Sequence, residues 1–217
     1  MPLIPNSNNS SNNQTKAPPK QELQFNKSAP IYTFADLILS ENTLEELKTV
    51  VSAQKNWKKV FVDWGLGTVM KERKNLFVNL YGESGTGKSM SAHAIAAALD
   101  KKLVCVNYAD IESKYVGDTS KNLSRLFSDP ANKDDIIFFD EADALLSKRV
   151  TDMSSATDVS VNQTRSVLLT LLNSYEGMAI FATNFISNYD SAFMRRIHYH
   201  IRFELPNKEL REKLWKH

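Results

Sequence analysis

The sequence predicts an α/β fold, with a parallel sheet of five strands and helices on both of its faces. Five short apolar runs occur from residue 76 onward, at residues 76–81, 103–108, 136–139, 178–182 and 199–205. Between them lie stretches with apolar residues at helical spacing, at residues 88–99, 120–127, 142–148 and 159–175. Near-continuous apolar strands that alternate with helices are typical of a parallel sheet that is covered on both sides.

The composition predicts one globular domain with a tail. The chain has 217 residues, of which 42% are hydrophobic and 24% are charged. It contains no apolar run of about 18 residues, which argues against a membrane span, and its start does not resemble a secretory signal. The single cysteine, Cys105, excludes an internal disulfide and a cysteine-based zinc site. We therefore expect a cytoplasmic protein with no membrane partner.

The net charge of +2 gives no reason to expect nucleic acid as the main partner. Residues 1–30 are predicted to form a disordered tail, because residues 6–27 are rich in Asn, Ser, Gln and Pro and carry few aliphatic side chains. Residues 31–206 are predicted to form the ordered domain. Its first helix is expected after Ser40, a plausible N-cap that precedes apolar residues at helical spacing.

A phosphate-loop pattern follows the first of the five apolar runs and opens an alanine-rich helix. Its residues are Gly82, Glu83, Ser84, Gly85, Thr86, Gly87, Lys88 and Ser89. In such a loop the backbone N–H groups surround phosphate oxygens, the lysine reaches the β- and γ-phosphates, and the hydroxyl after it binds Mg²⁺. The alternative is a glycine-rich turn that only caps a helix. The strand–loop–helix context favours a site for ATP and Mg²⁺ in a P-loop NTPase.

Two carboxylates follow the apolar run at residues 136–139. Asp140 is expected to hold Mg²⁺ through water, and Glu141 is expected to polarise the attacking water. An acidic pair after a strand is also a common helix N-terminus. The phosphate loop upstream favours the catalytic interpretation, because ligands collect at the carboxyl ends of parallel strands. Asp143 is expected to cap the next helix.

From these motifs onward, the sequence resembles the AAA+ ATPases, in the AAA-type branch and closest to a bacterial subgroup. The phosphate loop and the pair of Asp140 and Glu141 correspond to Walker A and Walker B. Three further segments follow in the family's order: residues 113–123 resemble the first pore loop and its helix, residues 182–184 resemble sensor 1, and residues 190–197 resemble the arginine-finger segment. The resemblance covers roughly residues 34–215 and implies the large α/β subdomain.

The resemblance also implies roles for individual residues. Asn184 would contact the attacking water or the γ-phosphate, and Arg195 or Arg196 would reach the nucleotide of a neighbouring subunit. Lys114, Tyr115, Val116 and Gly117 would contact a protein substrate. Taken alone, the asparagine could be a turn residue, the arginines solvated surface, and the tyrosine a side chain packed under its own loop. The segments do not show which arginine is the finger.

The family relationship further implies a homo-oligomeric ring, a hexamer, that remodels or threads a protein substrate. Residues 207–217 would begin the helical lid, which the family places next and which we expect this chain to lack beyond that point. One alternative is a nucleotide-gated scaffold with slow or no turnover. Another is a DNA-acting AAA+ ATPase, which the small net charge disfavours. The sequence names neither the client nor the process.

Overall fold

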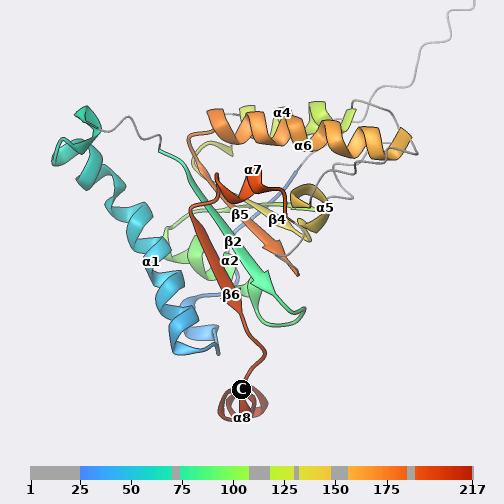
Figure 1. The fold of residues 1–217 in the computed structure, drawn as a ribbon. Coiled ribbons are helices and arrows are strands. Elements are labelled where there is room, and N and C mark those ends of the chain that lie inside the picture. Colours follow the sequence, from blue (N-terminus) through green and yellow to red (C-terminus); the bar gives the residue numbers. More distant parts are fainter. Residues whose placement is uncertain are drawn as a thin grey trace, which may run out of the picture.

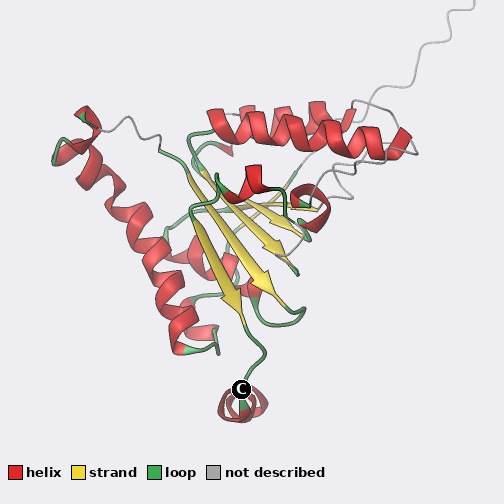
Figure 2. Ribbon diagram, in the orientation of Figure 1, coloured by secondary structure: helices red, strands yellow, loops and turns green. Residues whose placement is uncertain are grey.

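A computed structural model of the chain describes residues 25–69, 74–107, 118–129, 132–147, 156–184 and 189–216. Its centre is a twisted sheet with helices packed on both sides (Figures 1 and 2). The sheet has the strand order β1-β3-β4-β5-β2-β6. The strands are β1 (Asn26–Ser28), β2 (Leu76–Gly82), β3 (Leu103–Asn107), β4 (Ile136–Asp140), β5 (Met178–Thr183) and β6 (Tyr199–Phe203). The predicted α/β class is therefore confirmed.

The five predicted strands pair in parallel. β5 lies between β4 and β2, β3 pairs with β4, and β6 pairs with β2. The residues that pair across β4 and β5 are almost all fully buried, from Ile136 opposite Met178 to Phe139 opposite Phe181. This burial on both faces explains why these strands are continuous apolar runs in the sequence.

A sixth strand, β1, is not predicted by the sequence pattern. Residues Asn26–Ser28 pair antiparallel with β3 at one edge of the sheet, and Lys27 forms an ion pair with Asp135. The composition places these residues in the disordered tail, and for this short segment that prediction is wrong. Composition does not reveal the strand because the pairing uses backbone N–H and C=O groups, which residues of any polarity carry.

The helices divide between the two faces of the sheet. They are α1 (Glu41–Lys58), α2 (Lys88–Ala98), α4 (Asp118–Ser128), α5 (Asp143–Leu146), α6 (Ala156–Ser174), α7 (Ser191–Met194) and α8 (Lys208–Lys216). Short 3-10 helices η1 (Phe34–Asp36) and η3 (Leu66–Thr68) and a π-helical segment η2 (Lys59–Asp63) accompany α1. Buried side chains of α1 and α2 pack on one face, and those of α4, α5, α6 and α7 pack on the other.

Alternation along each strand supplies both cores. In β4, Phe139 points into the core under α4 and α6, whereas its neighbour Phe138 belongs to the core under α1 and α2. Phe139 stacks on Phe181 of β5, with ring centroids 5.1 Å apart. The ring stack fixes the two strands whose carboxyl ends carry the polar residues discussed below.

The first helix begins as the sequence predicts. Ser40 is the N-cap of α1, and its hydroxyl accepts a hydrogen bond from the Thr43 N–H at 3.3 Å. Leu47, Val50 and Val51 form its buried stripe. α8, by contrast, lies beyond the end of β6 with no buried residue, at the bottom of Figure 1.

Candidate active site

The phosphate loop joins β2 to α2 at the carboxyl edge of the sheet. Gly87 is the N-cap of α2, with φ +99°. It has no side chain that could accept the first N–H groups of the helix, so these groups face the loop. Gly82 passes so close to β6 that a Cβ atom there would lie 2.1 Å from the Phe203 carbonyl oxygen. Both glycines are therefore required by backbone geometry, which shapes the loop for an anion.

Lys88, the first residue of α2, connects two strand ends. Its Nζ atom donates to the carbonyl oxygens of Gly82 at 2.6 Å and Glu83 at 2.8 Å. It also donates to Asn184 Oδ1 at 3.3 Å, across the edge of the sheet. Lys88 is 8% exposed. The predicted phosphate-binding lysine and the predicted sensor residue thus lie side by side.

Burial sets the electrostatics of this lysine. It lowers the pKa of Lys88 from its ordinary value, because a charged ammonium loses hydration there. The carboxylates of Asp140, Asp143 and Glu83 oppose that shift by favouring the charged form. The three carboxylates thus favour the charged ammonium at the point where phosphate oxygens would enter.

Ser89 and Asp140, the two residues that the sequence analysis assigns to Mg²⁺, lie within hydrogen-bonding distance of each other. The Ser89 hydroxyl donates to Asp140 Oδ2 at 3.0 Å, and Asp140 Oδ1 accepts the Glu141 backbone N–H at 3.0 Å. A hydroxyl and a carboxylate oxygen at this separation fit Mg²⁺, which prefers oxygen ligands and keeps several waters. The described residues contain no cluster of three His, Cys, Asp or Glu side chains that could hold a metal alone. The donor set therefore suits an ion completed by phosphate and water.

Glu141 follows Asp140 with an uncommon backbone conformation. Its φ is +52°, in the left-handed region that non-glycine residues rarely adopt. Its side chain is exposed, next to the buried end of β4. Backbone strain of this kind collects at functional sites, where it directs a side chain.

Asn184 is held in place from behind by α5. The backbone N–H of Asn184 donates to both carboxylate oxygens of Asp143, each at 3.1 Å. The sequence predicts that Asp143 caps its own helix, but the N-cap of α5 is Ala142, which has no side-chain cap. The capping prediction is therefore wrong, because the Asp143 carboxylate accepts the N–H of Asn184 just beyond the neighbouring strand. Asp143 is thus part of the site.

Asn107 is a further polar residue at this edge of the sheet, which the sequence analysis did not single out. It ends β3 and pairs in register with Asp140 at the end of β4. Its side chain is exposed at the same edge of the sheet. The available signal was a polar residue at the end of an apolar run, whereas Asn184 was assigned through the resemblance to sensor 1.

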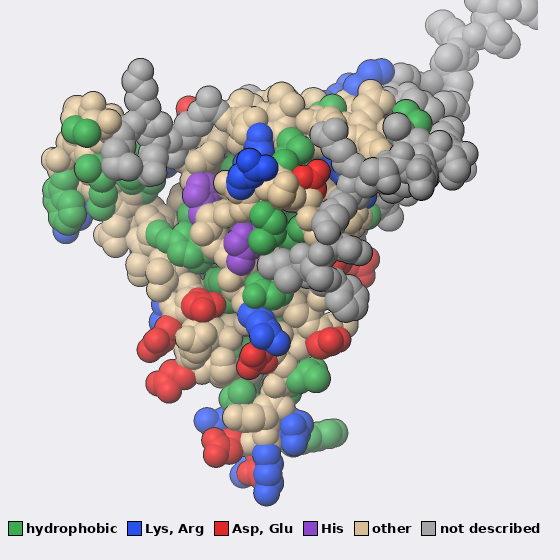
Figure 3. Space-filling model, in the orientation of Figure 1, with side chains coloured by type: hydrophobic (Ala, Val, Ile, Leu, Met, Phe, Trp, Pro, Cys, Tyr) green, Lys and Arg blue, Asp and Glu red, His purple; other side chains and the backbone are tan. Residues whose placement is uncertain are grey.

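The two arginines lie in the turn after α7. The Arg196 Nε donates to Asn173 Oδ1 on α6 at 2.7 Å, and its Nη1 donates to the Ala192 carbonyl oxygen at 2.7 Å. Arg195 is exposed, and its hydrogen bonds within the described part of the chain go to Ser191 of its own turn, at 3.3 and 3.5 Å. Lys and Arg side chains gather on the face of the molecule where α7 lies in Figure 1 (Figure 3). Among the described residues, neither arginine has a hydrogen bond to the phosphate loop.

A cavity of about 170 Å³ opens beside the phosphate loop. It is mostly apolar, and its wall residues include Leu37, Ile38, Met90 and Leu210 together with the loop backbone. These residues come from the segment before α1, from α2 and from α8.

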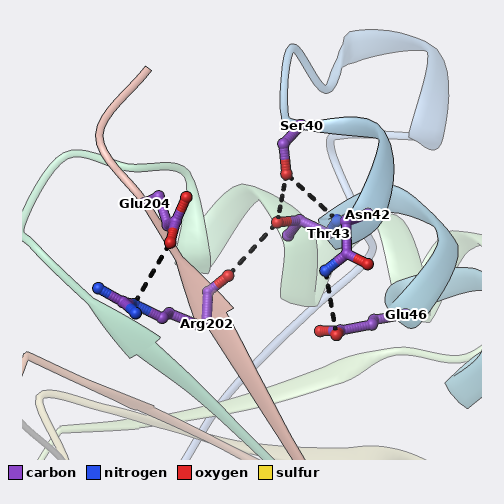
Figure 4. Close-up of polar contacts among 6 residues, drawn as sticks. All are labelled: Ser40, Asn42, Thr43, Glu46, Arg202 and Glu204. Carbon is purple, nitrogen blue, oxygen red and sulfur yellow. Dashed lines mark hydrogen bonds and ion pairs between the residues drawn. The ribbon is translucent and has the colours of Figure 1, made fainter. Parts of the chain in front are cut away.

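Hydrogen bonds hold two walls of this cavity together. The Thr43 hydroxyl near the start of α1 donates to the Arg202 carbonyl oxygen of β6 at 3.3 Å, and Ser40 bonds to Thr43 (Figure 4). Residues 36–39 form part of one of these walls.

The predicted substrate-contacting residues, Lys114, Tyr115, Val116 and Gly117, lie outside the described residues. So does most of the polar stretch at residues 150–158. Their placement stays a prediction. Within the described part of the chain, no helix is both long and apolar enough to cross a membrane.

Comparison with known proteins adds a family match. The model of the ATPase family associated with various cellular activities (AAA) matches residues 78–205. The chain is 35% identical over 137 residues to the ATPase family gene 2 protein of Schizosaccharomyces pombe, covering 62% of this chain and 17% of that protein.

Two further relatives match almost the whole chain. The 26S proteasome regulatory subunit 4 homolog B of Arabidopsis thaliana is 30% identical over 210 residues, covering 93% of this chain and 46% of that protein. The 26S proteasome regulatory subunit 8 homolog of Schizosaccharomyces pombe is 30% identical over 206 residues, with 92% and 50% covered. The chain spans half or less of the length of each of these three relatives.

Proposed function

This chain belongs to the ATPase family associated with various cellular activities (AAA), and from that premise we propose that it binds ATP with Mg²⁺ and hydrolyses it to drive work on a protein substrate. The observation that carries the proposal is the convergence of three strand ends. Lys88 contacts Asn184 at 3.3 Å, and Ser89 contacts Asp140 at 3.0 Å. These residues come from α2, β4 and the end of β5, far apart in the sequence.

Each residue has a distinct part in the proposed reaction. Lys88 and the N–H groups of the phosphate loop bind the phosphates and offset their charge. Ser89 and Asp140 would hold Mg²⁺, which would neutralise charge that develops on the transferred phosphoryl group. The exposed carboxylate of Glu141 would orient and polarise the attacking water. Asn184, whose position Asp143 fixes, would hydrogen-bond that water or the γ-phosphate.

We assign the nucleobase to the apolar cavity beside the loop. The cavity borders Gly85, Thr86 and Gly87, so a base placed there would leave its phosphates at the N-terminus of α2. Apolar walls with few polar groups are the usual lining of such pockets. Leu210 and Leu214 of α8 contribute to the lining, which makes the placement of α8 relevant to nucleotide affinity.

A ring of subunits, a hexamer, would complete the site. Arg195 is exposed, and its bonds to described residues stay within its own turn, which suits a guanidinium that contacts the nucleotide of a neighbouring subunit. The relatives that are named as regulatory subunits of the 26S proteasome support protein as the substrate class. In this proposal, Lys114, Tyr115, Val116 and Gly117 contact the substrate chain.

The function is tested by measuring ATP hydrolysis over a range of protein concentrations, with Mg²⁺ present or chelated. Three arms contain no addition, an unfolded polypeptide, and DNA. We expect Mg²⁺-dependent hydrolysis that rises with protein concentration and with the polypeptide, and no response to DNA. ATP binding without hydrolysis at every concentration would favour a nucleotide-gated scaffold, and stimulation by DNA alone would favour a DNA-acting enzyme.

A further inference from the structure

A line of buried polar side chains crosses the apolar core beside the proposed site. The Tyr189 hydroxyl donates to the Thr183 hydroxyl oxygen, and the Thr183 hydroxyl donates to Asn79 Oδ1 at 3.2 Å. The three residues are 5%, 1% and 0% exposed, respectively. They come from the segment before α7, from β5 and from β2. The line therefore joins three parts of the chain through side chains alone.

Stability does not account for this line. Asn79 lies in a strand flanked by two others, and its Nδ2 atom is buried without a hydrogen-bond partner among the described residues. A buried donor without a partner destabilises a fold, whereas apolar residues of similar size would pack there without that cost. The polar line therefore suggests a role in positioning, and the residues next to its ends indicate what it positions.

The line ends at two functional positions. Thr183 immediately precedes Asn184, the residue that contacts Lys88. Tyr189 immediately precedes Asp190, which is the N-cap of α7. The Asp190 Oδ1 atom accepts the Ala192 N–H at 2.8 Å, and the turn after α7 carries both arginines. The hydrogen bond between Tyr189 and Thr183 thus links the residue before Asn184 to the residue before Asp190.

A second attachment, through α5, joins the same two positions. At one end of α5, Asp143 binds the Asn184 N–H. Near the other end, the Leu146 carbonyl oxygen accepts the Asp190 N–H at 3.0 Å, and Ser147 pairs with Tyr189 in an antiparallel bridge.

A buried arginine of α6 holds that second end. Arg165, which is 4% exposed, donates to the Ala144 carbonyl oxygen at 3.0 and 3.2 Å and to the Ser147 hydroxyl. One short helix, α5, is therefore bonded to both positions. Because α5 connects them, a displacement of Asn184 and a displacement of the Tyr189 segment are mechanically linked.

We propose that Tyr189 is a positioning residue that couples Asn184 to the arginine turn, so that nucleotide bound at Asn184 sets the placement of Arg195 and Arg196. This coupling rests on the proposed function, because it assumes that ATP occupies the phosphate-loop site. Coupling between two sites is reciprocal, so docking of the arginines would also alter nucleotide affinity. Burial raises the pKa of Tyr189 to about 12, so its hydroxyl remains a donor across the pH range of a cell.

The chain contains a matched control for this hydroxyl. Tyr175 is also buried, at 7% exposure, and burial raises its pKa to about 12 as well. Its hydroxyl, however, has no hydrogen-bond partner among the described residues. Tyr189→Phe and Tyr175→Phe therefore remove the same atom from similar surroundings, but only the first variant breaks a hydrogen bond between two segments.

The experiment measures amide hydrogen exchange of residues 189–197 with and without a non-hydrolysable ATP analogue and Mg²⁺. In the parent chain and in Tyr175→Phe, we expect the analogue to change exchange in this peptide by at least about threefold. In Tyr189→Phe, the analogue should bind with unchanged affinity while the change in exchange is largely lost. Equal responses in all three proteins, or no response in the parent chain, would overturn the coupling.

Binding and exchange together separate the coupling from the proposed function. A parent chain that does not bind the analogue contradicts the proposed function itself, whereas binding without a response at residues 189–197 contradicts only the coupling. Should Tyr189→Phe unfold at the assay temperature, Thr183→Val breaks the same line from the other side and must give the same result. In the hydrolysis assay, Tyr189→Phe should cause no further loss once Arg195 and Arg196 are both replaced by Ala, because it acts through them.

Discussion

At the phosphate loop, Lys88 bonds to residues at two strand ends of its own chain, whereas the bonds of Arg195 to described residues stay within the turn that carries it. In the first region, a buried lysine already contacts its partners, and in the second, Arg195 presents its charged group to solvent. Under the proposed function, one chain would bind the nucleotide, while the arginines would act on the nucleotide of a neighbour. Variants of the two regions should therefore respond differently to protein concentration.

The largest effect is expected from Lys88→Ala. The change removes the buried ammonium that binds two loop carbonyls and Asn184, and with it the side chain that reaches the phosphates. We expect affinity for ATP to fall by about 10²-fold or more at every protein concentration. Titration with a fluorescent ATP analogue measures this. Lys101→Ala is the control, because Lys101 is also a part-buried lysine that donates to a backbone carbonyl, at 2.7 Å.

If Lys88→Ala bound the analogue as tightly as Lys101→Ala, the assignment of the phosphate loop would be wrong. Circular dichroism of both variants shows whether the fold is kept. We expect the fold to remain, because Lys88 belongs to neither hydrophobic core.

The second effect concerns chemistry within one chain. Glu141→Gln keeps the shape of the side chain but removes the charge that would polarise water. We expect ATP binding to be retained and hydrolysis to fall by about 10²-fold. Single-turnover measurements separate the two quantities. Glu176→Gln, an exposed glutamate outside the site, should hydrolyse ATP like the parent; normal hydrolysis by Glu141→Gln would show that another residue orients the water.

The arginine turn should give an effect that depends on association. Arg195→Ala or Arg196→Ala should reduce hydrolysis by about tenfold or more where the parent rate rises with concentration, with little change in ATP binding. The rate per subunit, read alongside mass from light scattering, tests this. Arg125→Ala removes an exposed arginine of α4 and should behave as the parent. A monomer with full activity at every concentration would contradict a finger supplied by a neighbour.

The smallest effect is expected where the N-terminal segment contacts α2. His93 Nδ1 accepts the Ile31 N–H at 3.4 Å, and burial lowers the pKa of His93 below its ordinary value. The unfolded chain then binds a proton more readily than the folded chain, so stability should fall as pH decreases through 6.5, the ordinary value for histidine.

Thermal unfolding at pH 7.5 and 5.5 measures this loss, which should be smaller in His93→Phe. That variant keeps a ring to contact Tyr32 but cannot titrate. An identical acid shift in both proteins would assign the dependence to other groups, such as His200, whose pKa burial also lowers.

The same contrast explains what could be predicted from the sequence. The phosphate loop, the end of β4 and the buried strands are contiguous patterns, so Lys88, Ser89 and Asp140 could be assigned to one site from residue order alone. The bonds of Tyr189 to Thr183 and of Arg165 to Ser147 join residues whose types have no fixed pattern. Which hydroxyl meets which partner depends on the packing of α5, α6 and α7, and composition carries no information about it.

The two outer strands of the sheet bear on how copies of the chain can associate. β1 is three residues long and carries Lys27 at its centre, and β6 carries Arg202. Short edges with charged side chains are poor templates for the addition of another strand, so they guard against aggregation through continued strand pairing. Copies that associate would then use side-chain surfaces, in line with the proposed docking of Arg195 or Arg196 on a neighbour.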